Sequence, residues 1–187
     1  MQKITDRQWR IYKQTAEKEP TITEDVEKIT KDNGMELFGL DTRLKTPSSL
    51  YEKMRERGSI ADIKEMKDIV RYTGVTSRDK LTQSTLACFS DFKRKGYKIL
   101  EVKNTWVDKN AIYKGIGVFF VSPNGLIFEM QFHTAESYRA KSKMHSLYEI
   151  RRTLSDDDPQ AKEFDEKMRR YSVSLKPPKN INRIRNK

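Results

Sequence analysis

The stretch IFEMQFHT, residues 127–134, places three polar side chains on one face of an expected β-strand. Successive side chains of a strand point to opposite faces, so Glu129, Gln131 and His133 lie together and the aromatic and methionine side chains lie opposite. A carboxylate held on a strand can act as a general base or bind a metal ion. The polar face of an antiparallel sheet is also commonly open to solvent, so the pattern alone leaves both interpretations open.

The segment RLKTPSSLYEKM gathers three cations and a hydroxyl around the start of an expected helix. Arg43 and Lys45 share one face of the extended part, and Ser49 and Lys53 are one helical turn apart. The first turn of a helix adds free N–H donors and a partial positive charge, so these residues could bind a polyphosphate. A solvated basic surface is the competing explanation.

The segment KDIVRYTGV carries a carboxylate at the mouth of an expected strand. Asp68 at this position could bind Mg²⁺, and Arg71 follows three residues later. The competing explanation is that Asp68 caps a nearby helix or pairs with Lys67.

The segment NTWVDKNAIYKG combines an aromatic residue with cations in a loop before the next strand. Its candidate residues are Lys109, Asn110, Tyr113 and Lys114. Such a loop could stack on a nucleotide base and neutralise its phosphates. A tyrosine at a strand start can equally be structural.

Several other chemistries are excluded. The chain has no GxxxxGK[ST] P-loop and no serine-hydrolase elbow. His133 and His145 lack the spacing of a metal-binding pair, and Cys88 lies in a helical pattern with no base opposite it. A cysteine nucleophile is therefore not expected.

Composition points to a single soluble domain with an anionic partner. The 187 residues are 35% hydrophobic and 35% charged, and the net charge of +11 favours nucleotides, nucleic acid or acidic membrane surfaces. A solubilising surface would explain the same charge. There is no apolar run long enough to span a membrane and no signal peptide, and the single cysteine fits a reducing cytosol.

The elements that must position these residues alternate along the chain. Helical patterns cover residues 6–19, 22–34, 49–57, 78–95, 134–154 and 159–171, and strand patterns cover 35–40, 68–75, 97–107, 116–122 and 126–133. This order predicts an α+β fold, in which helices flank one mixed sheet.

Taken in order, the segments resemble the synthetase domain of the RelA/SpoT family, the alarmone synthetases. The family pattern RxKxxxSxxxK is met from Arg43 to Lys53, and the family's metal-binding aspartate corresponds to Asp68. Its Lys-x-x-x-Tyr loop and its ExQ strand correspond to residues 109–113 and 129–131. The resemblance covers roughly residues 39–152.

The resemblance implies a nucleotidyltransferase-like fold and a Mg²⁺-dependent pyrophosphokinase, which moves the β,γ-diphosphate of ATP to the 3′-hydroxyl of an acceptor nucleotide. The residues implied to bind ATP are Arg43, Lys45, Ser49, Lys53 and Arg71. The metal ligands and catalytic carboxylates would be Asp68 and Glu129. The residues implied to bind the acceptor are Lys109, Asn110, Tyr113, Lys114, Gln131 and His133.

The resemblance also divides the chain. It implies a synthetase domain (35–171), which follows the helical lead-in (1–34). The composition of residues 172–187, which hold five Lys/Arg and no acid, indicates a basic C-terminal tail. Such a tail is expected to be flexible or to rest on a phosphate backbone. With neither a hydrolase nor a regulatory domain, the chain resembles a small, stand-alone synthetase.

Two departures from the family pattern concern the substrates. The arginine that usually stands five residues after the aspartate is replaced by Thr73, although Arg71 shares its strand face. His133 stands where relatives usually carry an arginine. These changes, together with Tyr-Lys-Gly, resemble the toxic, phage- or secretion-associated branch of the family.

Three functions are weighed. The first is synthesis of an alarmone from a guanosine or adenosine nucleotide (GDP, GTP, ADP or ATP), as in the stringent response or as a toxin. The second is a toxin that pyrophosphorylates the 3′ CCA end of tRNA, which the charge and the basic tail favour. The third is a non-catalytic nucleotide- or RNA-binding module.

A toxin would act in the cytoplasm of the producing or target cell and would have an antitoxin or immunity partner. The oligomeric state stays open.

Overall fold

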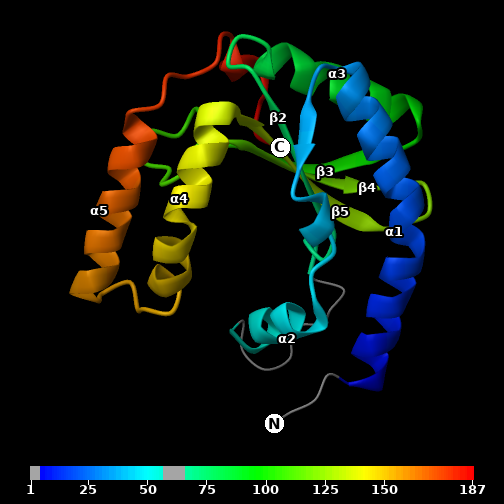
Figure 1. The fold of residues 1–187 in the computed structure, drawn as a ribbon, viewed down its shortest axis with the longest axis horizontal. Helices are drawn as coiled ribbons and strands as arrows, with labels where there is room; N and C mark the ends of the chain where they lie inside the picture. Colours follow the sequence, from blue (N-terminus) through cyan, green and yellow to red (C-terminus); the bar gives the residue numbers. More distant parts are fainter. Residues whose placement is uncertain (1–4, 57–65) are drawn as a thin grey trace.

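The computed structural model describes residues 5–56 and 66–187 (Figure 1). Its helices are α1 (Asp6–Asp32), α2 (Pro47–Glu56), α3 (Leu81–Arg94), α4 (Ala135–Arg151) and α5 (Pro159–Val173), with the 3-10 helices η1 (Leu40–Thr42) and η3 (Ile181–Arg183). Its strands are β1 (Glu36–Phe38), β2 (Arg71–Thr76), β3 (Lys98–Asn104), β4 (Ile116–Val121) and β5 (Ile127–Thr134). The expected end of the helix over 49–57 lies partly outside the described residues.

The described strands form one mixed sheet in the order β1-β2-β5-β4-β3. The β2–β5 pair is parallel, whereas the neighbouring pairs are antiparallel. This register sets Arg71 beside Glu129 and Thr73 beside Gln131, although the paired segments are far apart in sequence. The predicted α+β fold, a mixed sheet flanked by helices, is confirmed.

One face of the sheet forms the main core with α1 and α3. Phe128, Met130 and Phe132 of β5 are fully buried there, as the alternation of the strand predicts. The ring of Phe92 in α3 packs 4.6 Å from that of Phe120 in β4, measured between centroids. Burial of each such side chain stabilises the fold by about 1.5–3 kcal/mol. The opposite face is left for α4 and for the site.

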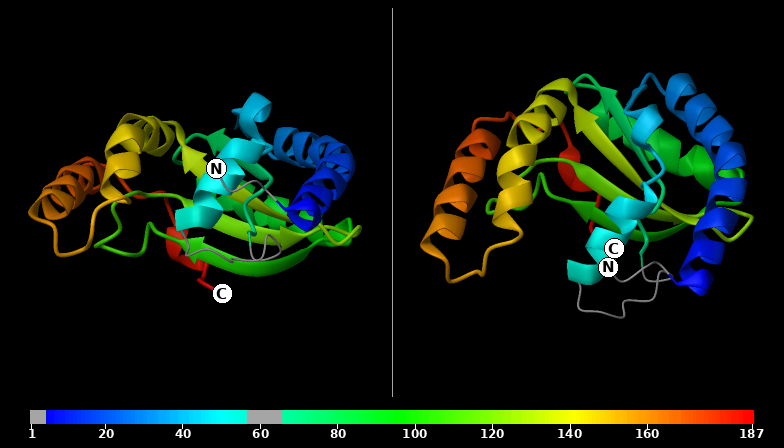
Figure 2. Two further views of the ribbon diagram at one scale, coloured as in Figure 1. Left: turned by 90° about the horizontal axis from the view of Figure 1, so that it is seen from below. Right: turned by 60° about the horizontal axis from the view of Figure 1, so that its bottom comes forward.

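The remaining helices are distributed around the sheet. In Figures 1 and 2, α4 and α5 lie side by side on one flank, α1 lies on the other, and α2 lies between them. Thr134 caps α4 by accepting a hydrogen bond from the backbone N–H of Ser137, so α4 begins directly where β5 ends. The last residue of the strand therefore fixes where the helix starts over the sheet.

The N-terminal helix α1 is continuous, where the sequence predicted two helices. It runs through Pro20, which costs a helix interior roughly 3 kcal/mol. The buried positions Glu19, Ile22, Val26 and Ile29 follow the spacing of a single helical stripe across the proline. Packing of this stripe on the core outweighs the local preference for a break.

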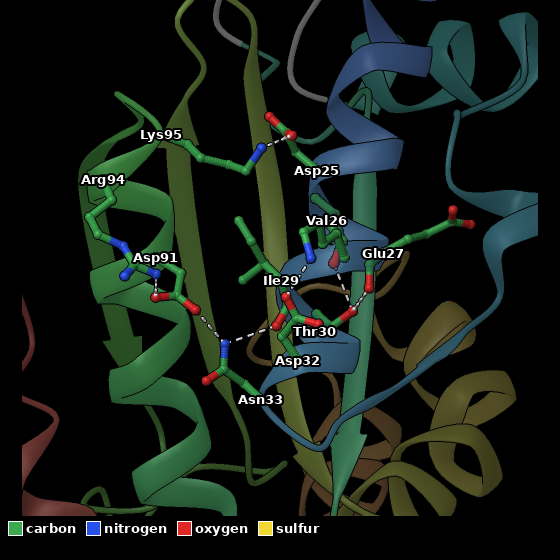
Figure 3. A network of polar contacts seen from close by, with 11 residues as sticks. Asp25, Val26, Glu27, Ile29, Thr30, Asp32, Asn33, Asp91, Arg94 and Lys95 are labelled. Atoms are coloured by element: carbon green, nitrogen blue, oxygen red, sulfur yellow. Dashed lines mark hydrogen bonds and ion pairs between the residues drawn. The ribbon is translucent and has the colours of Figure 1, made fainter.

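Polar contacts also hold α1 against α3 (Figure 3). The Asn33 side-chain amide donates to the Ile29 carbonyl at 2.9 Å and to the Asp91 carboxylate at 2.8 Å. Lys95, just after α3, forms an ion pair with Asp25 at 2.6 Å. These contacts link the end of one helix to the end of the other.

The basic C-terminal segment is packed onto the sheet, so the expectation of a free tail is wrong. Ile181 and Ile184 are buried in the main core. The Asn104 side chain donates to the carbonyls of both residues, at 2.9 and 2.8 Å. Lys187 exchanges two backbone hydrogen bonds with Val102 of β3. The sequence suggested a tail because charged and polar residues outnumber the two isoleucines that anchor this segment.

Candidate nucleotide-binding cleft

A cleft of about 660 Å³ opens over the face of the sheet that α1 and α3 leave free. Its lining comes from the segment between η1 and α2, from β2 and β5, from the loop before β4 and from α4. It contains these residues predicted from the sequence: Arg43, Lys45, Ser49, Lys53, Asp68, Arg71, Tyr113, Glu129 and Gln131. The fold thus brings together four segments that are separate in sequence.

Arg43 enters the cleft tied to a buried carboxylate of α1. Its guanidinium donates to both oxygens of Glu19, at 2.6 and 3.2 Å, and to the Leu40 carbonyl at 2.7 Å. Glu19 is only 3% exposed and also accepts from Thr23 and Tyr72. Burial alone would raise the pKa of Glu19, but the hydrogen bond from Arg43 and those from the two hydroxyls outweigh it and lower the pKa. Glu19 therefore stays ionised and holds Arg43 in place.

Asp68 lies between the two lysines of the predicted phosphate-binding segment. The Asp68 carboxylate pairs with Lys53 and, at 3.4 Å, with Lys45. Burial would raise the pKa of Asp68, but the hydrogen bond from Lys53 and the charge of Lys45 lower it below its usual value. Burial lowers the pKa of Lys45, and the charge of Asp68 opposes that change. The three groups form a compact charged cluster at the start of β2.

Ser49 lies in the first turn of α2. The Ser49 backbone N–H donates to the Thr46 hydroxyl at 3.2 Å, as in an N-cap, and Pro47 occupies the first helical position. Thr46 also donates its hydroxyl proton to the Ser49 hydroxyl at 3.0 Å. The sequence Thr-Pro-Ser-Ser thus fixes the helix start that faces the cleft.

Glu129 and Gln131 form the floor of the cleft on β5. The Gln131 amide donates to Glu129 Oε1 at 2.7 Å, and the amide oxygen accepts from Lys141 of α4. Gly117 of the neighbouring strand lies beside Glu129, since a Cβ built there would come 3.8 Å from Oε1.

Tyr113 closes one wall of the cleft. It packs with Met144 of α4 and Met168 of α5 in a small apolar cluster. Burial, and then the negative charge of Glu129, raise the pKa of its hydroxyl, so Tyr113 is neutral at pH 7. A neutral aromatic ring beside a carboxylate is suited to contact the flat surface of a base.

The remaining predicted residues do not line the cleft. Lys109 and Asn110 are exposed in the loop, and the Lys114 ammonium donates to the backbone carbonyls of Thr105 and Asp108. His133 is 1% exposed and lies 3.1 Å from the Ser137 hydroxyl. The prediction that His133 lies on the open polar face of the strand is therefore wrong, because the start of α4 covers this residue.

Burial also determines the protonation of His133. It lowers the pKa of the imidazole to about 3, with a further contribution from the charge of Lys141, so the ring is neutral at pH 7. Gly115 makes room for the ring, because a Cβ there would lie 2.5 Å from His133 Cε1. This histidine is part of the packing under α4.

One row of residues that line the cleft from α4 and its C-cap was not predicted from the sequence. Its members are Lys141, His145, Tyr148 and Arg152. Their spacing of four, three and four residues is that of one helix face, so the signal was present in the sequence. It could only be recognised once α4 was known to lie over the polar side of β5.

The donor set suits a metal ion that is bound together with phosphates. Mg²⁺ is usually held by one or two carboxylates plus substrate oxygens, and Asp68 and Glu129 both line the cleft. Among the side chains that the structure describes, those of residues 5–54 and 66–187, no group of three or more His, Cys, Asp or Glu is arranged to hold a metal ion by itself. The residues therefore fit Mg²⁺ only in company with a bound nucleotide.

The same fold occurs in solved structures. The crystal structure of the complex between the Type VI effector Tas1 and its immunity protein has a chain that matches with a TM-score of 0.67 and 19% identity, covering 91% of this chain and 96% of that chain. Small alarmone synthetase 1 from Bacillus subtilis, bound to its product pppGpp, matches with a TM-score of 0.60 and 18% identity, covering 90% of each chain. A GTP pyrophosphokinase family protein from Streptococcus pneumoniae matches with a TM-score of 0.58 and 19% identity, covering 89% of this chain and 88% of that chain.

The chain therefore has the fold of the small alarmone synthetases, as the resemblance implied. Its sequence matches no protein-family model and no curated protein. Among the described helices, none combines the length and the apolar character needed to cross a membrane.

Proposed function

We propose that this chain is a pyrophosphokinase, which transfers the β,γ-diphosphate of ATP to the 3′-hydroxyl of an acceptor nucleotide. One observation carries the proposal. The cleft joins a cation-rich helix start, from Lys45 to Lys53, to the carboxylates Asp68 and Glu129. Phosphoryl transfer needs this combination, because the chemistry depends on positioning the phosphates and neutralising their charge.

The donor nucleotide is assigned to the side of the cleft formed by α2. Lys45 and Lys53 are held there by Asp68, and the first turn of α2 provides backbone N–H groups near Ser49. Arg43, fixed by Glu19, offers its guanidinium plane to the base or its edge to a phosphate. These residues would hold the triphosphate of ATP before transfer.

Mg²⁺ held by Asp68 and Glu129 would neutralise charge on the transferred diphosphate. Glu129 Oε1 accepts from Gln131, and no other described side chain forms a hydrogen bond with Glu129. Its second oxygen is thus available to accept the proton of the acceptor 3′-hydroxyl. Tyr113 would contact the acceptor base from the opposite wall.

Nucleotide acceptors are favoured over a tRNA end by the packing of the C-terminal segment. The free basic tail that would have supported tRNA binding is anchored by Ile181 and Ile184. The net charge of +11 still suits a polyanion, so the experiment described next includes tRNA among the acceptors. A protein of similar fold was crystallised with an immunity protein, and we propose that this chain, acting as a toxin, would have such a partner.

The test uses ATP labelled with ³²P at the γ-phosphate, with Mg²⁺ and, separately, GDP, GTP, ADP, unlabelled ATP and deacylated tRNA. We expect label in a nucleotide product. Label in tRNA alone would assign the second function, and binding of nucleotides without any transfer would indicate the non-catalytic module.

Variants connect the reaction to the cleft. Glu129→Gln and Asp68→Asn should each reduce transfer by at least about 100-fold, since each removes one charge at the phosphoryl centre. Glu36→Gln, at an exposed position on β1, should transfer like the unaltered protein. Undiminished transfer by either cleft variant would show that its carboxylate has no role in the reaction.

A further inference from the structure

The arginine and lysine side chains of the cleft are not equally neutralised. Arg43 pairs with Glu19, Lys45 and Lys53 pair with Asp68, and Arg152 pairs with Glu149 at 3.0 Å. Arg71 and Lys141 also line the cleft, but neither forms an ion pair with a carboxylate among the side chains that the structure describes, those of residues 5–54 and 66–187. These two cations are therefore the arginine and lysine side chains of the cleft that form no ion pair within the described part of the chain.

The sheet register brings the two cations to the same patch. Arg71 is paired with Glu129 across the parallel strands, so both side chains lie on the cleft face. Gln131 lies two residues further along that face and accepts a hydrogen bond from the Lys141 ammonium. Arg71 from the sheet and Lys141 from α4 thus flank the pair Glu129 and Gln131.

The surroundings of Lys141 show that its charge is not yet compensated. Burial, and then repulsion by Arg71, lower the pKa of Lys141 to about 8, while the charge of Glu129 opposes this only in part. Tyr113 lines the same cleft from the loop before β4, and His145 and Tyr148 line it from the helix that carries Lys141. An anion bound between the two cations would offset their mutual repulsion, which is the second cause of the lowered pKa after burial.

The donors that remain free are of the kinds that bind a phosphate group. An ammonium has three N–H donors, and Lys141 uses one of them on Gln131. The Arg71 guanidinium makes no hydrogen bond to the described residues, so its planar set of donors stays available. Glu129 is the nearby acid, but it is already engaged by Gln131 and pairs with neither cation.

We propose that Arg71 and Lys141 form a subsite for a phosphate group of a nucleotide bound in the cleft, with Gln131 holding Lys141 toward the sheet. The proposal rests on the proposed function, because it assigns a part of the same substrate. It adds a residue of α4 to the binding site, and it gives Gln131 the role of positioning Lys141.

Binding measurements test the subsite without requiring turnover. Isothermal titration calorimetry with ATP, ADP, GDP and inorganic pyrophosphate, each with Mg²⁺, is compared between the unaltered protein and Lys141→Met. Lys143→Met is the matched control, because Lys143 is exposed on the same helix two residues away. We expect Lys141→Met to reduce the affinity for at least one of these ligands by about tenfold or more, which is the usual effect of losing one charge-assisted hydrogen bond. Lys143→Met should reduce the affinity for none of them. The nucleotide whose binding is weakened shows whether the phosphate belongs to the donor or to the acceptor.

Further variants separate a binding role from a structural one. Lys141→Arg keeps the charge and should retain most of the affinity, and Arg71→Met should weaken the same ligand as Lys141→Met. Thermal unfolding of each variant shows whether the fold is retained. Equal affinities of Lys141→Met and Lys143→Met for all four ligands would overturn the subsite, as would weakening of different ligands by the Arg71 and Lys141 variants.

The outcome is distinguishable from failure of the proposed function. If the unaltered protein binds nucleotide but transfers no label to any acceptor, the proposed function fails. The subsite is still supported in that case when Lys141→Met loses affinity and Lys143→Met does not.

Discussion

Replacing Glu19 by alanine removes a carboxylate from Arg43, Thr23 and Tyr72 at the same time. Glu19 is 3% exposed, so the side chains left behind cannot simply exchange it for bulk water. Removing one partner of a buried ion pair costs about 3–5 kcal/mol. The Arg43 side chain is 32% exposed and can be partly hydrated, so the expected loss is at the lower end, about 3 kcal/mol.

The assay is thermal and urea unfolding of Glu19→Ala, with Glu17→Ala as the control at an exposed position of the same helix. A loss of about 3 kcal/mol lowers Tm by roughly 6–12 °C for a chain of this size. Glu19→Gln keeps the volume and a hydrogen-bond acceptor, so it should lose less, about 1–2 kcal/mol.

The pH dependence gives a second measure of the same contact. The pKa of Glu19 is lowered from its ordinary value of 4.5, so the stabilisation is present above pH 4.5 and is lost as pH falls through the folded-state pKa. Glu19→Gln should lack this component. If Glu19→Ala unfolds at the same temperature as Glu17→Ala, the contact between α1 and Arg43 contributes nothing, and this reasoning is refuted.

Three further predictions concern other buried positions. The pKa of His133 is about 3 in the folded chain and near 6.5 in the unfolded chain, so the free energy of unfolding should be highest above pH 6.5 and fall by about 1.4 kcal/mol per pH unit between those two values. Urea unfolding of His133→Gln should show a smaller decrease with falling pH. The same decrease in His133→Gln as in the unaltered protein would contradict the assignment. Burial raises the pKa of the Cys88 thiol to about 12, so a thiol reagent should react with it only in denaturant, and rapid reaction of the native protein would show that the site opens. Gly115→Ala should destabilise the fold by about 1–3 kcal/mol in urea, since its Cβ would meet the His133 ring, and an unaltered midpoint would show that the ring can move aside.

The sequence was sufficient for the parts of the site that depend on local patterns. The alternation of β5 set Glu129 and Gln131 opposite the apolar residues, and the core face of the strand is buried as expected. The helix start at Pro47 follows from its own residues. These features need only the chain within a few positions of the residue concerned.

Features that depend on long-range packing were not predicted. Glu19 lies 24 residues before Arg43 on a separate helix, so no local pattern connects them. Lys141 lies ten residues after Gln131 and reaches it only because α4 packs against β5. His133 is buried because Gly115 has no side chain and because Ser137, in the first turn of α4, lies against the ring. In each case the deciding neighbour is supplied by tertiary structure.

The packing of the C-terminal segment on β3 has a consequence for how the protein behaves at high concentration. β3 is the last strand of the sheet, and an open outer strand can pair with a strand of another molecule. The two backbone hydrogen bonds between Lys187 and Val102 occupy part of that edge. The segment from residue 172 to 187 carries five lysines and arginines and no acid, and we expect this positive charge to oppose the approach of a second copy. The final residues of the chain thus protect the sheet against edge-to-edge aggregation.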